Sequence, residues 1–188
     1  VASDASSNST SVSFTITVID DEDPIIAAMP GDLTLENTSG TCSAPATWIE
    51  PTASDNCASV TLSSDHLLGS EFTVGSTVVT YTALDGNGNS SSSFFTVTVQ
   101  DVEEPTISGG SSDLLVSTDA GDCGAVVNWP LPTAIDNCGL FYFSGTHISG
   151  STFPQGETVV SYTAIDESGN SSSLSFSITV TDEENPII

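Results

Sequence analysis

The chain has 188 residues, with 25 Asp or Glu, two His and no Lys or Arg, so its formal net charge at pH 7 is −25. Such a chain cannot neutralise nucleic-acid phosphates, and it offers no polybasic patch to an anionic membrane. Apolar residues make up 37% of the chain and fall in short runs, none of which approaches the roughly 18 apolar residues of a membrane span.

The sequence repeats itself every 81 residues. Pro24, Pro105 and Pro186 follow one another at this offset, and the two complete copies agree at 37 of 81 positions without a gap. Self-similarity at a fixed period is typical of a tandem array. We predict that residues 1–23 are the C-terminal hairpin of a preceding repeat, 24–104 the first repeat, 105–185 the second repeat, and 186–188 the start of a further one.

Short runs that alternate apolar residues with Ser or Thr predict half-buried strands. DGNGN at 85–89 and DESGN at 166–170 predict tight hairpins, because Gly and Asn tolerate positive φ. With about seven short strands in each repeat, we predict an all-β fold of tandem immunoglobulin-like β-sandwiches. The clearest runs are SVSFTITV at 11–18, STVVTYTAL at 76–84, SSFFTVTV at 92–99, ETVVSYTAI at 157–165 and LSFSITV at 174–180.

Each complete repeat resembles a hyalin repeat, or HYR domain. The first copy carries GTCSAPATW, PTASDNC and VVTYTALDGNGN, and the second carries GDCGAVVNW, PTAIDNC and VVSYTAIDESGN. The resemblance implies an immunoglobulin-like module of extracellular and cell-surface proteins that serves adhesion and scaffolding and carries no chemistry. Many animal members have further cysteines where Met29 and Gly110 stand here, and after the positions of Asn89 and Asn170. Their absence favours a bacterial-type variant.

Each repeat contains two cysteines that are 15 residues apart. We predict the disulfides Cys42–Cys57 and Cys123–Cys138, each closing a strand onto the following loop and each worth about 3 kcal/mol. Disulfides imply an oxidising, extracellular compartment. The alternative, a thiolate metal site, would usually show closer cysteine pairs and more ligands.

The aromatic residues that follow the first cysteine of each pair are predicted to lie in the core. Trp48 and Trp129 stand six residues after that cysteine, and a role in stacking on sugars is the alternative. His66 and His147 have no second His or Cys nearby in sequence, which favours a structural or surface role over metal binding.

Acidic residues gather where the repeats meet. In an immunoglobulin-like sandwich, the loop with the SDNC or IDNC motif and the GN hairpin both lie at the end where the chain enters. Calcium takes six to eight oxygen ligands, so we predict a calcium site at each junction; solvated acids that start turns are the alternative. The predicted ligands are Asp20, Glu22, Asp55 and Asp85 at the first junction, and Asp101, Glu103, Asp136 and Asp166 at the second.

Four N-x-Ser/Thr sequons are candidate glycosylation sites, although the same residues also suit hairpin turns. The sequons begin at Asn8, Asn37, Asn89 and Asn170.

The chain has no phosphate loop, no nucleophile elbow and one His per repeat, so we expect no enzyme.

These patterns predict a non-catalytic structural and adhesive segment of a long extracellular protein, such as a stalk, fibre or filament. The expected partners are neighbouring repeats, other copies in a fibre, and glycans or surface proteins. One alternative is a glycan- or protein-binding module whose contact patch is Phe141–Phe143, where the two copies diverge. Another is a filament subunit that assembles by strand complementation.

Overall fold

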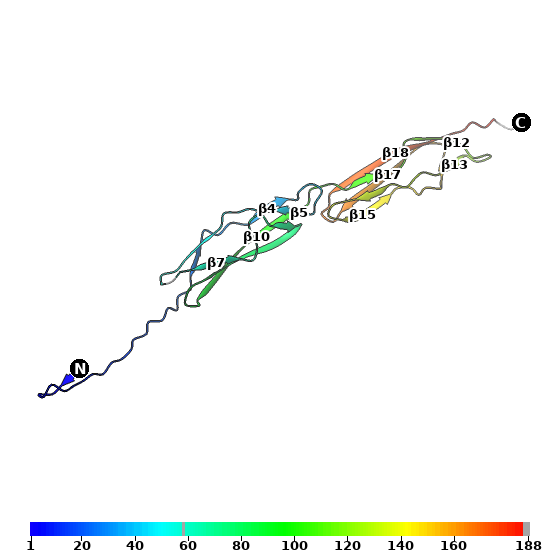
Figure 1. Ribbon diagram of the computed structural model, residues 1–188. Helices are drawn as coiled ribbons and strands as arrows, with labels where there is room; N and C mark the ends of the chain where they lie inside the picture. Colours follow the sequence, from blue (N-terminus) through cyan, green and yellow to red (C-terminus); the bar gives the residue numbers. More distant parts are fainter. Residues whose placement is uncertain (58, 186–188) are drawn as a thin grey trace. The chain divides into compact units, whose positions relative to one another are not determined.

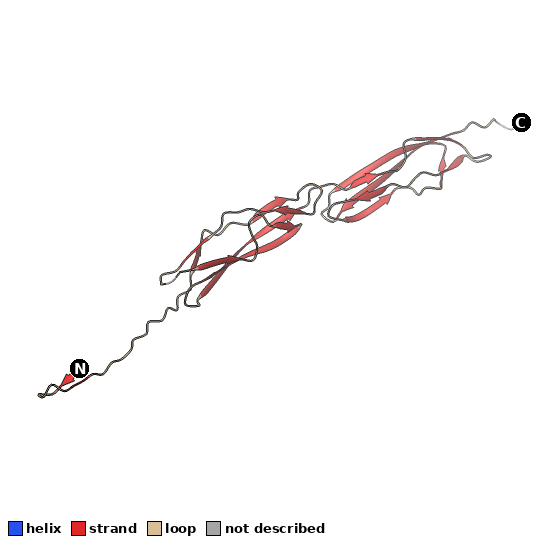
Figure 2. Ribbon diagram, viewed as in Figure 1, coloured by secondary structure: helices blue, strands red, loops and turns tan. Residues whose placement is uncertain are grey.

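The computed structural model describes residues 1–57 and 59–185 (Figure 1). These residues form strands, turns and loops, and none of them is helical (Figure 2). The described part of the chain therefore holds no helix that could span a membrane. The predicted start of a further repeat, residues 186–188, lies outside the described residues.

Each repeat contains eight described strands rather than about seven, because the run between its two cysteines is divided into two short strands. A further short hairpin precedes the first repeat. It consists of β1 (Ala2–Ser3) and β2 (Ser9–Thr10). The first repeat has β3 (Ile25–Ala27), β4 (Leu33–Glu36), β5 (Ser43–Pro45), β6 (Thr52–Ser54), β7 (Thr61–Ser64), β8 (Glu71–Thr73), β9 (Gly75–Leu84) and β10 (Ser90–Gln100). The second has β11 (Thr106–Ser108), β12 (Leu114–Ser117), β13 (Gly124–Val127), β14 (Thr133–Ile135), β15 (Leu140–Gly145), β16 (Ser151–Pro154), β17 (Gly156–Asp166) and β18 (Ser171–Thr181).

Both repeats have the same strand order, which is that of an immunoglobulin-like sandwich. One sheet of the second repeat runs β12-β18-β17-β15, with β12 parallel to β18 and the other pairs antiparallel. The pairs β11–β14 and β13–β16 form the rest of the sandwich. The first repeat has the corresponding sheet β4-β10-β9-β7 and the pairs β3–β6 and β5–β8. This arrangement confirms the predicted fold class.

The core forms because every second residue of the long strands points inward. In β17 and β18, buried residues alternate with Ser, Thr and other more exposed residues, as the period-2 pattern predicts. Trp129 is 6% exposed, packs edge-on against Phe153 and Phe176, and donates a 2.8 Å hydrogen bond from Nε1 to the Tyr162 hydroxyl. The predicted core role of this tryptophan is confirmed.

Contacts within the chain divide it into two compact units. The junction that precedes the first repeat lies within the first unit. The second unit contains the second repeat together with the turn before β5, so that the junction between the two repeats lies inside it. The first unit holds the described residues of Val1–Pro30, Ile49–Asp65 and Thr80–Phe94; the second holds Gly31–Trp48, His66–Val79 and the described residues from Phe95 onward.

Candidate functional site

Three carboxylates gather where the chain enters the first repeat. Asp20 belongs to the entering segment, Asp55 to the loop after β6, and Asp85 to the hairpin between β9 and β10. One oxygen of each lies within 4.8 Å of the others. The hairpin also holds the entering segment, because Asn87 Nδ2 donates to the Asp20 carboxylate (2.8 Å) and Asn89 Nδ2 to the Asp20 main-chain oxygen (3.3 Å). The three acidic segments predicted to converge here are therefore brought together.

Asp85 is buried and held firmly by its own hairpin. Its Oδ1 accepts hydrogen bonds from the main-chain N–H groups of Asn87, Gly88 and Asn89 at 2.6–2.9 Å, and its Oδ2 accepts one from Asn89 Nδ2 at 2.8 Å. Burial works to raise the pKa of this carboxyl, but the hydrogen bonds together outweigh it and lower the pKa below its usual value. Asp85 therefore remains a carboxylate at neutral pH and shapes the turn.

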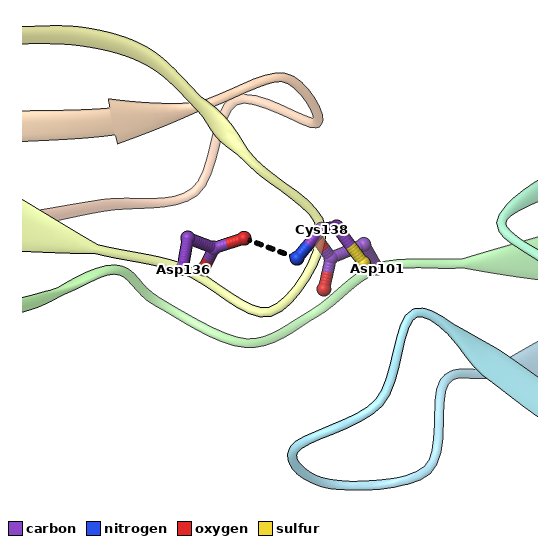
Figure 3. A group of neighbouring side chains, drawn as sticks. All are labelled: Asp101, Asp136 and Cys138. Atoms are coloured by element: carbon purple, nitrogen blue, oxygen red, sulfur yellow. Dashed lines mark hydrogen bonds between the residues drawn. The ribbon is translucent and has the colours of Figure 1, made fainter.

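Asp101, Asp136 and Cys138 lie together at the second junction (Figure 3), and two of the carboxylate oxygens are buried without a hydrogen-bond partner among the described residues. Asp101 is 7% exposed, and its Oδ1 accepts the Glu103 N–H at 3.2 Å. Asp136 Oδ1 accepts the Cys138 N–H at 2.8 Å. The Oδ2 atoms of both aspartates are buried and accept no hydrogen bond within the described part of the chain. Asp101 and Asp136 each have an oxygen within 4.8 Å of the other's and of Cys138 Sγ.

Three predicted ligands lie outside these two groups and instead accept hydrogen bonds from nearby loops and turns. The Glu22 carboxylate accepts a hydrogen bond from the Asn56 amide. Glu103 turns back onto its own repeat, where it accepts hydrogen bonds from Ser39 Oγ (2.6 Å) and the Gly40 N–H (2.7 Å). Asp166 is 1% exposed, and its oxygens accept hydrogen bonds within the hairpin it begins. Five of the eight predicted ligands are thus brought together.

The sequence has no Lys or Arg that could balance these carboxylates. A buried carboxylate without a partner is unfavourable unless it takes up a proton or meets a cation. The oxygens available come from Asp side chains and are hard ligands of the kind that calcium prefers. The donor set at both junctions therefore fits calcium, with Asp20, Asp55 and Asp85 at the first and Asp101 and Asp136 at the second.

The structure corrects the predicted disulfides. Cys42 and Cys138 form a bridge between the first and the second repeat, with Cα atoms 4.9 Å apart and a sequence separation of 96. Cys57 and Cys123 are exposed and unbridged. The predicted pairs Cys42–Cys57 and Cys123–Cys138, each within one repeat, were therefore wrong.

The physical reason is visible in the second repeat, whose two cysteines lie at opposite ends. Cys138 is at its leading end, where the chain enters beside Asp101. Cys123 is at its trailing end, next to a turn in which the Thr118 N–H donates to the Thr181 oxygen at the end of β18. The 11 residues of β18 cover about 35 Å between these ends, whereas a disulfide needs Cα atoms within about 7 Å.

Sequence reasoning also missed the turn that faces the second repeat from the first. Residues 37–42 receive one contact from the second repeat besides the bridge, because Asn137 Nδ2 donates to the Thr41 oxygen at 2.9 Å. The linker residue Glu103 binds the same turn from within the first repeat. The signal lies in the repeat itself, because Gly40 and Glu103 recur 81 residues later as Gly121 and Glu184 and make the same contact.

All four candidate glycosylation sites use their amide nitrogens within the fold. At Asn37, Asn89 and Asn170, Nδ2 donates to two acceptors, and at Asn8 one acceptor is found among the described residues. A glycan replaces one hydrogen of Nδ2 and therefore competes with these bonds at the first three sites. The acceptors include Asp4 for Asn8, Thr41 for Asn37, Asp85 for Asn89 and Asp166 for Asn170.

Several known proteins resemble the chain. Hyalin from Lytechinus variegatus is 36% identical over 185 residues, which are 95% of this chain and 35% of that protein. Hyalin from Strongylocentrotus purpuratus is 37% identical over 183 residues, 94% of this chain and 15% of that protein. The chain thus spans about a third or less of these relatives. Both are sea-urchin proteins, so they give no support to the expected bacterial-type variant.

Solved cadherin structures show weaker likeness. Cadherin domains 1–5 of protocadherin gamma B2 match 88% of this chain and 40% of that chain at 14% identity, with a TM-score of 0.38. Domains EC1–3 of Drosophila N-cadherin match 86% and 68% at 14% identity, with a TM-score of 0.30. The fold assignment does not depend on them, since it rests on the strand order.

A family model described as the HYR domain matches residues 19–99 and 100–180. Each match is as long as the repeat and begins five residues before it (19 against 24, and 100 against 105). The chain therefore belongs to the HYR domain family, whose members are extracellular and cell-surface modules, and it carries two copies of the domain in tandem.

Proposed function

We propose that the chain is a non-catalytic structural and adhesive segment of a long extracellular tandem-repeat protein, a stalk, fibre or filament, whose junctions are stiffened by calcium. The observation that carries the proposal is that the buried Oδ2 atoms of Asp101 and Asp136, at the junction between two HYR copies, have no hydrogen-bond partner in the described part of the chain. A chain without Lys or Arg has no side chain that could neutralise them at neutral pH.

Calcium explains both the composition and the geometry. Without a cation, carboxylates this close together repel one another, since they lie well within a Debye length of about 8–10 Å. With calcium bound, the linker, the loop after β14 and the turns around them share one ion. The two repeats are then fixed to each other, as a stiff stalk or fibre requires.

The test compares the chain in calcium, in EGTA, and in NaCl at equal ionic strength. Extracellular calcium modules commonly bind at about 10⁻⁴–10⁻³ M, so 10 mM calcium adds about 1.4–2.7 kcal/mol of stability by linkage. We expect a higher melting temperature and reduced flexibility in small-angle scattering, both abolished by chelation. Asp101→Asn should lose the effect, while Asp122→Asn, an equal charge change at an exposed turn, should retain it. The proposal would be contradicted if neither the dimensions in scattering nor the melting temperature changed with calcium.

A second candidate function is recognition of a glycan or a protein by the edge strand β15. A β-bulge between Leu140 and Tyr142 interrupts its pairing with β17, and Phe141 and Tyr142 are 77% and 48% exposed. Phe143 instead stacks on Tyr162 and belongs to the core side. A glycan array probed with the chain and with Phe141→Ser tests this function: binding that the substitution removes supports it, and no binding by either chain contradicts it.

The strand-complementation alternative rests on residues 12–18. Val12, Phe14, Ile16 and Val18 are exposed by 76–91%. The residues that correspond to the last three in the first repeat, Phe95, Val97 and Val99, are core residues of β10. This segment has the pattern of a last strand and would fit into a sandwich that lacks one. Concentration-dependent oligomers that vanish with Phe14→Asp would support the alternative, and a monomer at all concentrations would exclude it.

A further inference from the structure

We propose that Cys57 and Cys123 are the two halves of further inter-repeat disulfides, so that Cys57 bonds to a preceding HYR repeat and Cys123 to a following one. The observation is that the Cys42–Cys138 bridge has a half at the trailing end of one repeat and a half at the leading end of the next. Cys123 corresponds to Cys42, and Cys57 to Cys138, at the 81-residue offset.

Cys123 is held in the same surroundings as Cys42. The Cys42 main-chain oxygen accepts the Val74 N–H at 3.1 Å, and the Cys123 oxygen accepts the Gln155 N–H at 3.1 Å. The turn before each cysteine closes with the same main-chain bonds, from residues 38 to 43 and 41 to 38 in the first repeat and from 119 to 124 and 122 to 119 in the second. Cys123 is therefore presented in the conformation that bridges at Cys42, and it is exposed.

Cys57 repeats the geometry of Cys138. The Cys138 N–H donates to Asp136 Oδ1 at 2.8 Å, and the Cys57 N–H donates to Asp55 Oδ1 at the same distance. The segment that enters each repeat is also held alike: the hairpin amides Asn89 and Asn170 donate to the main-chain oxygens of Asp20 and Asp101. Cys57 is therefore exposed at the leading end of a repeat, where the entering segment is already held in place by the hairpin.

The partner of each thiol is a cysteine of an adjacent HYR repeat. Cys57 would pair with the cysteine that corresponds to Cys42 in the preceding repeat, and Cys123 with the cysteine that corresponds to Cys138 in the following one. When such a bridge forms, two thiols lose two protons and two electrons and one S–S bond is made. The electrons reduce a small disulfide oxidant, such as oxidised glutathione, to two thiols. Each repeat then carries one bridge at each end, and none within itself.

The experiment uses the intact chain and a lengthened chain in which a second copy of residues 105–185 directly follows residue 185. This keeps the phase, because Pro105 of the added copy takes the place of Pro186. Both chains are oxidised in a glutathione buffer, alkylated, and cut with proteases specific for acidic and aromatic residues, because trypsin has no site. Mass spectrometry then maps every bridge and every alkylated thiol.

We expect one bridge in the intact chain, Cys42–Cys138, with Cys57 and Cys123 alkylated. In the lengthened chain we expect a second bridge, from Cys123 to the Cys138 of the added copy, while the number of thiols remains two. Cys123→Ser in the lengthened chain should remove this bridge alone and leave three alkylated cysteines. Melting curves of the variants identify any that fail to fold.

Two results would overturn the inference. In the first, Cys123 of the lengthened chain stays alkylated although Cys42–Cys138 is closed in the same molecules. In the second, Cys123 pairs with Cys138 of its own repeat. Neither result depends on calcium, so the inference and the proposed function can fail separately.

Discussion

At the scale of single residues, the acidic surroundings of Cys57 set its reactivity. Partial burial raises the pKa of the Cys57 thiol, and the charges of Asp20, Asp55, Glu22 and Asp85 raise it further, because a thiolate here would face like charges. The thiolate is the form that reacts with disulfides and alkylating reagents. Cys57 is therefore kept less reactive until a partner or a cation changes its surroundings.

We predict that alkylation of Cys57 by iodoacetamide reaches its half-maximal rate at a pH above that of an ordinary cysteine. Asp20→Asn should shift the midpoint downward, because one repelling charge is removed. Asp21→Asn removes the same charge from an exposed neighbour and should leave the midpoint nearly unchanged. The measurement is the alkylated fraction of the Cys57 peptide across a pH series. A midpoint below the ordinary value would contradict the assigned surroundings.

The pKa of Glu103 is shifted in the opposite direction from that of Cys57, because hydrogen bonds stabilise its charged form. Hydrogen bonds from Ser39 Oγ and the Gly40 N–H lower the pKa of its carboxyl below the usual 4.5, although burial opposes them, and the Asn37 amide adds a weaker bond. A carboxyl whose pKa is lower in the folded than in the unfolded state stabilises the fold above its unfolded pKa. This stabilisation disappears as the pH falls through the folded value.

Glu103→Gln should therefore lower the free energy of unfolding at pH 7, and the difference from the wild type should shrink as the pH falls below 4.5. Urea unfolding at a series of pH values measures this difference. Glu157→Gln, at an exposed position of β17, serves as the control and should give a small difference at every pH. A Glu103 difference that grows in acid would refute the argument.

At the scale of strands, close approach between β13 and β16 requires a glycine. A Cβ added to Gly124 would lie 2.6 Å from the main-chain oxygen of Phe153, a contact that only a backbone shift can relieve. Gly124 lies opposite Pro154 at the start of this strand pair, and the next two partners, Ala125 and Phe153, are core residues. The pair therefore has little room to move.

We expect Gly124→Ala to cost about 1–3 kcal/mol of folding free energy, as overpacking generally does. Gly31→Ala is the matched control, because a Cβ there meets no atom within 4 Å. Thermal and urea unfolding of the two variants gives the comparison. Equal stabilities would show that the two strands separate more easily than the contact implies.

Most strands and their hairpins could be predicted because the patterns are local, but the alternating run at 11–18, which was predicted to be a strand, forms none. Alternation in residues 157–165 and 174–180 defines β17 and β18, and Asp followed by Gly-Asn defines the turns. The convergence of Asp20, Asp55 and Asp85 followed from the strand directions of the fold class. Glu103 did not join its group, because Ser39 Oγ and the Gly40 N–H bind its carboxylate. Sequence spacing carries no information on such competition. Asp166 makes the same turn hydrogen bonds as Asp85 but lies outside its group, a difference that these bonds do not explain.

The disulfide pairing could not be decided by the repeat spacing. A bridge within each repeat and a bridge between repeats both recur every 81 residues, so the periodicity fits either. The informative feature was the segment between Cys123 and Cys138, which contains two extended strands and no tight turn that would return it. A segment that runs from one end of the sandwich to the other cannot bring its own ends together.

At the scale of the whole molecule, the Cys42–Cys138 bridge joins residues 96 positions apart. Closing a loop of about 100 residues lowers the entropy of the unfolded chain by the equivalent of about 4.7 kcal/mol. Cys42→Ser should therefore lower the free energy of unfolding by up to this amount. Cys57→Ser alters a cysteine without a bridge in this chain and should change stability by less than about 0.5 kcal/mol. Denaturant unfolding without reductant compares them, and equal losses would contradict the bridge.

The bridge also changes what a protease can achieve. The linker at residues 101–104 carries Asp101, Glu103 and Glu104, so an acid-specific protease can cut there. The cut pieces would still be joined through Cys42 and Cys138, which lie on either side of the linker. A nick would thus add one water to the molecule but leave its two pieces covalently joined until a reductant is added. Damage to the peptide chain between repeats and loss of the distal part become two separate events, and the second requires reducing conditions as well as a protease.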